Sequence, residues 1–279
     1  MVPTRKEQRS SPAFERYGLK LWSVNYSYLP EARKLLQVGI CDFIEVFVIP
    51  GSYPDAFGKW AGLNTEFVIH APHYDFGVNL SDKGLLSNNL RRIGEALKFA
   101  DSLNSKRVIV HPGVGGPVEE TARQLRAIGD GRLTIENKPF FGRNRSRCTG
   151  SSPEEIGFLL QETGAGLCLD IGHAICAANA RRIDSMAYLD DFLKLKPNWY
   201  HLADGELNGV TDRHLHLGAG SYDLSQIMAR IPRPRSITIE TEKDSPERLD
   251  DFVQDVLFLR RLVSRWDEPV VGRTSAVRG

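Results

Sequence analysis

The chain repeats one pattern eight times: a short run of β-branched and other apolar residues is followed by a segment whose apolar residues have helical spacing. The runs lie at 19–24, 43–49, 67–71, 107–111, 132–136, 166–171, 198–202 and 236–241. Helical spacing is clearest at 85–103, 153–163 and 246–263. Pro153 and Pro246 each follow a serine, which predicts that two of these helices begin there. Eight such units predict an α/β fold, a single (β/α)₈ TIM barrel, with a doubly wound open sheet as the alternative.

The bulk composition fits one globular domain. With 279 residues, 41% hydrophobic and 25% charged, the chain is in the usual range for an undivided barrel. We expect the barrel to span 17–265 and the segments 1–16 and 266–279 to be loosely ordered tails. The net charge of +1 gives no overall attraction to nucleic acid or to anionic membranes. Neither a signal peptide nor a membrane span is visible, so we expect a cytoplasmic protein without a membrane partner.

Polar side chains stand at the predicted C-terminal ends of the strands, where the active site of a TIM barrel forms. They are His70, His73, His111, Glu136, Asp170, His173, His201 and Glu240, and the loop after the seventh run adds Asp212, His214 and His216. All seven histidines of the chain therefore lie at or near one rim. Imidazole and carboxylate are ligands of zinc, manganese and iron(II), and these are too many for one ion, so we expect two or three ions. The four cysteines have no CxxC spacing, so thiolate ligands are not expected.

Five of these residues differ in the role that we expect. Glu136, Asp170 and Glu240 each lie at the end of an otherwise apolar run or one residue before it, where an unpaired carboxylate is rare, so we expect them to be functional. His70 and His216 are the weaker metal candidates, because each lies two or three residues from another candidate and neighbours on a strand end point to opposite faces. We assign these two histidines to substrate binding instead.

In their order and context these residues resemble endonuclease IV, the family 2 apurinic/apyrimidinic endonucleases, within the xylose-isomerase-like TIM-barrel superfamily. The resemblance spans about 19–242 and includes PHYDFGVNL, VHPG, IEN, DIGHA, HLAD, DRH followed by LGAG, and IET. It implies three zinc ions: one on His73 and His111, a second on Asp170, His201 and Glu240, and a third on His173, Asp212 and His214. It also implies that Glu136 bridges the first two ions.

The sequence departs from this family where the family grips DNA. The loop after the second run, PGSYPDAFGKW, lacks the family's intercalating arginine, and Tyr74, Asp75 and Phe76 follow His73. Sugar phosphate isomerases and epimerases of the same superfamily share much of the motif pattern. We therefore expect a small phosphoester or a sugar as the substrate, and DNA is the less favoured partner.

Two reactions are compatible with this rim. The first is phosphoester hydrolysis of the endonuclease IV type, in which a di- or trinuclear zinc cluster activates water. The second is isomerisation or epimerisation of a sugar or sugar phosphate, in which a glutamate moves the proton and one Mn²⁺ or Mg²⁺ is held by Glu136, Asp170, His201 and Glu240. We favour the hydrolase, because one ion would not require His73, His111 and His214. A barrel that only binds a ligand is the third and least favoured alternative.

The catalytic and substrate-binding residues are assigned on the same basis. We expect Glu136, Glu240 and His173 to be catalytic. The basic loop 142–147 (GRNRSR) follows the fifth run, so Arg143, Arg145 and Arg147 can hold a phosphate, with a solvated loop as the alternative. Aromatic residues near the ends of the first three runs can stack on a sugar or base: Trp22, Tyr26, Phe47, Tyr53, Trp60, Tyr74 and Phe76. We assign Tyr74 to substrate binding and expect Trp22 and Phe47 to be core residues.

Overall fold

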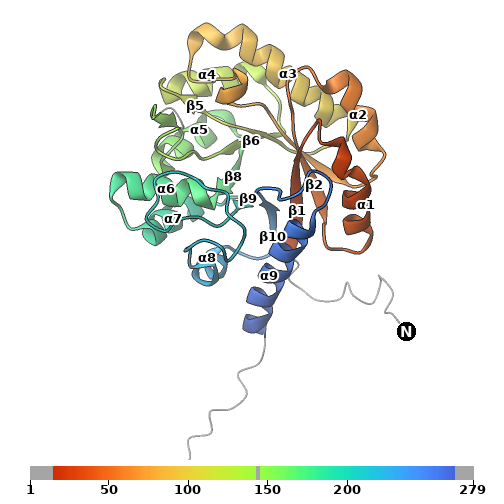
Figure 1. Ribbon diagram of the computed structural model, residues 1–279. Helices are drawn as coiled ribbons and strands as arrows, with labels where there is room; N and C mark the ends of the chain where they lie inside the picture. Colours follow the sequence, from red (N-terminus) through yellow and green to blue (C-terminus); the bar gives the residue numbers. More distant parts are fainter. Residues whose placement is uncertain (1–14, 143–144, 268–279) are drawn as a thin grey trace, which may run out of the picture.

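Eight parallel strands close into a barrel, and helices surround it (Figure 1). The computed structural model describes residues 15–142 and 145–267. The barrel strands are β1 (Glu15–Trp22), β2 (Phe43–Phe47), β3 (Glu66–His70), β4 (Val108–Val110), β6 (Leu133–Glu136), β8 (Gly166–Asp170), β9 (Trp199–Leu202) and β10 (Arg235–Ile239). Their order is β1-β10-β9-β8-β6-β4-β3-β2, so the first strand pairs with the last. The predicted TIM barrel is confirmed, and the open-sheet alternative is wrong.

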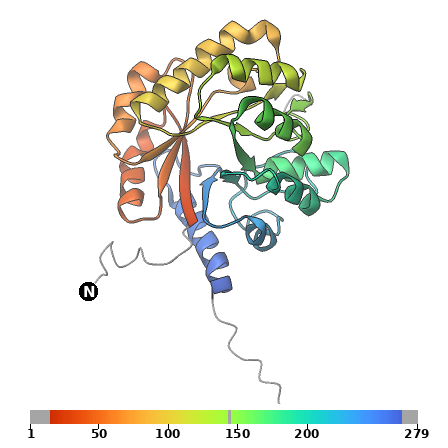
Figure 2. The same cartoon turned by 180° about the vertical axis from the view of Figure 1, so that it is seen from behind.

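Helices follow the strands and cover the outside of the barrel. They are α1 (Leu29–Gln37), α2 (Tyr53–Ala61), α3 (Leu86–Ser102), α4 (Val118–Ile128), α5 (Pro153–Thr163), α6 (Ile171–Arg181), α7 (Ser185–Leu193), α8 (Leu224–Arg230) and α9 (Asp250–Asp267). Within the described residues, the loops contain the short 3₁₀ helices η2 (Tyr26–Tyr28), η3 (Tyr74–Phe76) and η4 (Lys83–Leu85), and a two-stranded sheet of β5 (Gly113–Val114) and β7 (Cys148–Thr149). Figure 2 shows α9 between α8 and α1, so the last helix closes the outer ring beside the first.

One predicted helix start is confirmed and one is wrong. Helix α5 begins at Pro153, and the Ser152 hydroxyl accepts the N–H of Glu155 at 3.3 Å as the predicted N-cap. Helix α9, in contrast, begins at Asp250 and not at Pro246.

The later start of α9 has a physical cause in the loop before it. The Ser27 hydroxyl donates to the carbonyl of Pro246 at 2.6 Å, and the Tyr28 hydroxyl donates to the carbonyl of Ser245. These two carbonyls are therefore held by the loop after β1 and do not begin the hydrogen-bond ladder of a helix. Asp250 and Asp251 then provide the negative charges that favour a helix N-terminus.

The ends of the barrel differ slightly from the expected boundaries. Strand β1 starts at Glu15 rather than at 17, because the Glu15 carboxylate contacts the guanidinium groups of Arg233 and Arg235 and pairs the strand with β10. Helix α9 runs to Asp267 rather than to 265. The rest of the two expected tails lies outside the described residues. Within the described ranges, no helix is both long enough and apolar enough to cross a membrane.

The interior of the barrel has two layers, because side chains along a strand alternate between its two faces. The lower layer is one apolar cluster made of Phe43, Val68, Ile109, Cys168 and Trp199. Each of these residues is followed, two positions later, by a polar residue in the same strand or just after it. These polar residues are Glu45, His70, His111, Asp170 and His201. The two-residue period of the strands therefore places a polar layer above an apolar floor.

Candidate metal centre

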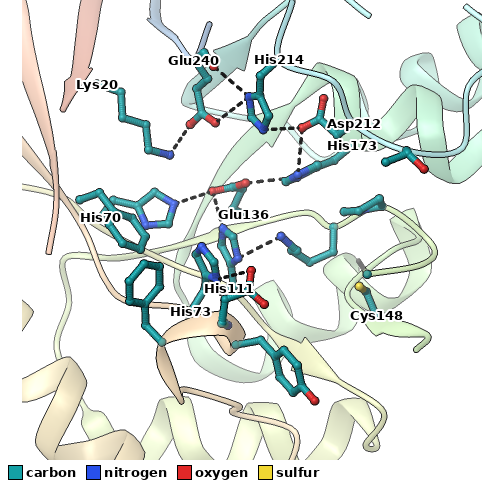
Figure 3. Close-up of a pocket in the computed structure, with 18 of the residues that line it drawn as sticks. Lys20, His70, His73, His111, Glu136, Cys148, His173, Asp212, His214 and Glu240 are labelled. Carbon is teal, nitrogen blue, oxygen red and sulfur yellow. Dashed lines mark hydrogen bonds and ion pairs between the residues drawn. The ribbon is translucent and has the colours of Figure 1, made fainter. Parts of the chain in front are cut away.

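Glu136, the last residue of β6, is at the centre of the polar layer. Its Oε2 lies 2.9 Å from Nε2 of His70 and 3.0 Å from Nε2 of His111. Nδ1 of His201 approaches the same oxygen to 3.4 Å, and Nδ1 of His173 lies 3.2 Å from Oε1. The Glu136 side chain is only 1% exposed, so imidazoles rather than bulk water surround it (Figure 3).

The backbone fixes which nitrogen of His70 faces Glu136. Nδ1 of His70 lies 2.8 Å from the carbonyl of Ala71, and a carbonyl can only accept, so this nitrogen carries the proton. In the neutral ring Nε2 then presents a lone pair to the carboxylate of Glu136. A lone pair facing a carboxylate is unfavourable unless a cation lies with them or the ring is protonated.

A second group with the same arrangement contains His173, Asp212 and His214. Nδ1 of His173 donates to the carbonyl of Asn137 and Nδ1 of His214 to the carbonyl of Glu240, both at 2.9 Å. Nε2 of His173 and Nε2 of His214 face Oδ2 of Asp212 at 3.5 Å and 2.8 Å. Two lone pairs therefore converge on one carboxylate oxygen, which is a suitable place for a cation.

His201, on β9, also lies between carboxylates of the cluster. Its Nε2 lies 3.0 Å from Oε2 of Glu45, a fully buried carboxylate on β2. Its Nδ1 is buried without a hydrogen-bond partner among the described residues, yet lies 2.6 Å from Oε1 of Glu240. A carboxylate behind the ring and an unpartnered nitrogen in front of it are typical of a histidine that binds a metal.

Local sequence explains how the DIGHA segment enters the centre. Asp170 ends β8 and is the N-cap of α6, where its Oδ1 accepts the N–H of His173 at 2.7 Å. Asn137 connects this turn to β6: its side chain accepts from the N–H of Asp170 at 2.7 Å and donates to the Asp170 carbonyl at 3.0 Å. The first turn of α6 thus points His173 towards Glu136.

The loop after β9 is held by one buried carboxylate, Asp204. Its Oδ1 accepts the N–H groups of Gly205 and Tyr222 at 2.8 and 3.1 Å, and its Oδ2 accepts that of Gly218 at 2.9 Å. His214 lies within this loop at a φ of 47°, a left-handed conformation that a residue other than glycine seldom adopts. The loop contacts keep His214 in this strained conformation.

The pKa values reflect the unbalanced charge of the cluster. Burial disfavours the charged form of His214, but the Asp212 carboxylate outweighs burial and raises its pKa to about 9. Burial likewise opposes charge on His201, and the surrounding carboxylates together with Cys168 raise its pKa well above the usual range. Burial raises the pKa of Asp170 to about 6, although the neighbouring His173 lowers it. Protons on His201 and His214 thus balance part of the carboxylate charge, whereas burial lowers the pKa of His111 well below its usual range.

The donor set fits divalent metals. Three groups of ligand atoms lie within 4.8 Å of one another: His70 with His111 and Glu136, Glu45 with His201 and Glu240, and Glu136 with Asp170 and His173. All are nitrogen and oxygen donors, which suits zinc or manganese. The lone pairs aimed at carboxylates from His70, His201 and His214 are the structural observation that supports this fit.

Two lysines in the site were missed by the sequence analysis. Nζ of Lys20, on β1, contacts Oε1 of Glu240 and lies 3.3 Å from Oε1 of Glu45. Nζ of Lys138 lies 3.0 Å from Nδ1 of His111. Glu45 was missed as well, although a charged residue between apolar neighbours inside a strand is itself a signal.

A cavity of about 1100 Å³ opens above the cluster. Trp22, Phe47, Tyr74 and Phe76 line one side of it, and Arg145 is also in its wall. Phe47 is buried as expected, but Trp22 is 51% exposed, so its assignment to the core is wrong. Trp22 ends β1 on the same face as Lys20, which places its ring at the mouth of the barrel.

The remaining predicted residues lie at different distances from the cluster. His73 lines the cavity with its ring stacked on His111 at 5.0 Å, and its Nδ1 accepts the N–H of Asp75 at 3.3 Å. His216 lies between Asp244 and Asp255, with 3.1 Å to an oxygen of each. His70, which we assigned to substrate binding, thus lies within hydrogen-bond distance of Glu136, and His216 joins the β9 loop to α9. Arg143 lies outside the described residues.

A closed barrel with histidines and carboxylates at the C-terminal strand ends defines a class, and the family model of the xylose isomerase-like TIM barrel matches residues 38–262. The chain belongs to this family. It is similar to endonuclease 4 of Thermus thermophilus, with 32% identity over 167 residues, and this match covers 55% of the chain and 59% of that relative.

Two solved structures have the same fold. A D-tagatose 3-epimerase-like protein has a TM-score of 0.71 and 20% identity, with 90% of this chain and 98% of that chain covered. Endonuclease IV of Thermus thermophilus has a TM-score of 0.68 and 23% identity, with 90% and 99% covered. The fold is therefore shared with proteins of two different names, and the activity must be argued from the site.

Proposed function

We propose that the protein is a metal-dependent phosphoester hydrolase of the endonuclease IV type. It would use two or three zinc ions to activate water for the hydrolysis of a small phosphoester. The position of Glu136 carries this proposal: Nε2 of His70 and Nε2 of His111 face its Oε2, and Nδ1 of His201 lies 3.4 Å from the same oxygen, so the carboxylate lies between two groups of proposed ligands. A single ion would use only part of this arrangement.

The proposed ligands follow the contacts. His70 and His111 hold the first ion with Glu136. Glu136 also contributes to the second ion, which is held by Asp170, His201 and Glu240. The third ion is held by His173, Asp212 and His214. We propose His70 in the place that the sequence resemblance gave to His73, because Nε2 of His70 lies 2.9 Å from Oε2 of Glu136, whereas Nδ1 of His73 accepts the N–H of Asp75.

The chain's own residues position the substrate around this centre. Bound zinc supplies a Lewis acid that acidifies water and stabilises charge on phosphoester oxygens. Lys138 and Arg145 line the cavity and can donate to the non-bridging phosphate oxygens. Tyr74 and Trp22 provide exposed aromatic surface for the rest of the substrate. Glu136 and Glu240 would be catalytic as ligands that hold the metal ions beside the substrate. His173 would also be a metal ligand, and its ring is oriented by the hydrogen bond from Nδ1 to the carbonyl of Asn137.

Metal analysis combined with hydrolysis tests this proposal. Protein purified without chelator should contain about two to three zinc ions per chain and hydrolyse bis(4-nitrophenyl) phosphate. His111→Ala should lose bound zinc and activity. Lys194→Met, at an exposed lysine that pairs with Asp191, is the control and should keep both. Zinc-loaded protein that hydrolyses no phosphoester would contradict the proposal.

A duplex containing an abasic site separates DNA from small substrates. We expect small phosphoesters to be cleaved and the duplex to be left intact, because the loop after β2 lacks an intercalating arginine. Cleavage of the duplex would make DNA the substrate while leaving the metal assignment unchanged.

A sugar isomerase or epimerase is the second candidate, favoured by the surroundings of His201. Its Nδ1 lies 2.6 Å from Glu240 and 3.4 Å from Glu136, so two glutamates and one imidazole form a compact site for a single Mn²⁺ or Mg²⁺. In that reaction one glutamate would move a proton next to a carbonyl. About one manganese per chain, with interconversion of ketose epimers and no phosphoester cleavage, would favour this alternative.

A further inference from the structure

Lys20 brings a positive charge into the interior of the barrel. Its side chain is only 16% exposed, and its Nζ contacts Oε1 of Glu240 and lies 3.3 Å from Oε1 of Glu45. The same two carboxylates, with His201, form one of the three groups that could hold a metal ion. The ammonium thus contacts both carboxylates of this group.

The other oxygen of Glu45 is already satisfied by protein groups. The Thr238 hydroxyl donates to Oε2 at 2.7 Å, and Nε2 of His201 lies 3.0 Å from the same atom. Oε1 has no hydrogen-bond partner among the described residues, and it forms an ion pair with Lys20. Lys20 therefore balances the charge of this buried carboxylate together with His201.

The geometry also leaves Lys20 available to a ligand. An ammonium group has three N–H donors, and the contacts with Glu45 and Glu240 engage two of them. Lys20 lines the cavity, and Figure 3 shows its side chain directed to Glu240 at the edge of the cluster. The remaining donor can reach an oxygen in the cavity next to the metal groups.

We propose that Lys20 is the resident cation of the centre: it takes the place of a divalent ion between Glu45 and Glu240 and donates its remaining N–H to a phosphate oxygen of the substrate. The choice of a phosphate oxygen rests on the proposed function, whereas the role as a cation does not. A tethered ammonium, unlike a bound metal, is present before any ligand arrives.

Zinc and phosphate titrations of Lys20→Met test the two parts separately. Removing a positive charge beside the metal groups should strengthen zinc binding, with a dissociation constant at least about tenfold lower. Inorganic phosphate should bind the zinc-loaded variant about tenfold more weakly than the zinc-loaded wild type, because one charge-assisted hydrogen bond is lost. Calorimetry at fixed ionic strength measures both.

Three further variants provide controls. Lys20→Arg keeps the charge and should stay close to the wild type in zinc affinity. Lys194→Met removes an exposed lysine that pairs with Asp191 and should change neither affinity. If Lys20→Met alone does not fold, Lys20→Met combined with Glu45→Gln removes one charge of each sign. The double variant should return zinc affinity towards the wild-type value while phosphate binding stays weak.

The possible outcomes discriminate between the inferences. Unchanged or weaker zinc binding in Lys20→Met overturns the role as resident cation. Phosphate binding equal to that of the wild type, or no phosphate binding by the zinc-loaded wild type, overturns the substrate contact. Neither readout needs catalysis, so a failure of the proposed hydrolysis leaves the zinc shift in place and is recognised as a separate result.

Discussion

Each histidine of the cluster has two nitrogens with different partners. In His70 and His214 a backbone carbonyl engages Nδ1, and in His201 a carboxylate engages Nε2. These contacts fix the orientation of each ring, so its opposite nitrogen points at a carboxylate of the cluster. This preorganisation reduces the side-chain conformational entropy that is lost when a metal ion binds.

Variants of the two histidines near β3 test which of them binds metal. His70→Ala should lower the zinc content by about one ion per chain, because it removes a nitrogen 2.9 Å from Glu136. His73→Ala should keep the zinc content and alter only the cavity wall. Elemental analysis after dialysis measures the difference, and the reverse pattern would show that His73 is the ligand.

The residues at strand ends could be predicted from the sequence, whereas those inside strands were not. A search of the last two residues of each run finds Glu136 and Asp170 but passes over Lys20 and Glu45, which lie further inside their runs. Sequence spacing also cannot decide between His70 and His73. The backbone direction after β3 sets which ring turns inward, and that direction depends on the neighbouring strands.

Strand β1 approaches its neighbour β2 closely at Gly18. A Cβ atom at this position would lie 1.9 Å from Cε2 of Phe43, which is part of the apolar floor. The glycine is therefore required by packing, since its φ is not in the left-handed region. The floor supports the polar layer, because Gly18 and Lys20 lie on the same face of the strand.

Substitution at Gly18 should therefore destabilise the barrel. We expect Gly18→Ala to lower the free energy of unfolding by about 1–3 kcal/mol, because it overpacks a filled interior. Gly94→Ala on α3 is the control, since nothing lies within 4 Å of its Cβ position, and it should be neutral or stabilising. Chemical denaturation measures both. Equal stability of Gly18→Ala and the wild type would refute the packing argument.

A substitution of Asp204 tests whether this residue holds the loop after β9 in place. Asp204→Ala would leave the N–H groups of Gly205, Gly218 and Tyr222 without their acceptor. We expect faster proteolysis within this loop and loss of about one zinc ion, because Asp212 and His214 would no longer be held in place. Limited proteolysis with mass spectrometry locates the cut. Unchanged cleavage and zinc content would show that the loop does not depend on Asp204.

The overall fold was the most predictable level, because eight repeats of strand and helix leave few alternatives. The helix starts were less predictable. At Pro246 the local pattern favoured a helix, but Ser27 and Tyr28, distant in sequence, bind the carbonyls that a helix would need. Contacts of this kind are not visible in a local pattern.

Removing metal should affect the stability of the whole molecule, because the candidate ligands come from strands and loops around most of the barrel. A chelator should lower the melting temperature, and zinc at a thousand times its dissociation constant should restore about 4 kcal/mol. Differential scanning calorimetry at several zinc concentrations measures the shift. A melting temperature independent of zinc would mean that zinc does not bind the folded centre.

The pairing of Lys20 with Glu240 connects the first strand of the barrel with the end of the last. A nascent chain that has emerged only as far as β9 lacks this partner and the neighbouring strand, so its polar layer is open on one side. Under the proposed metal assignment, loading would follow synthesis of the complete barrel, and a chain truncated before β10 should bind zinc more weakly than the complete barrel. Metal binding at this centre would therefore depend on the presence of the last strand, β10.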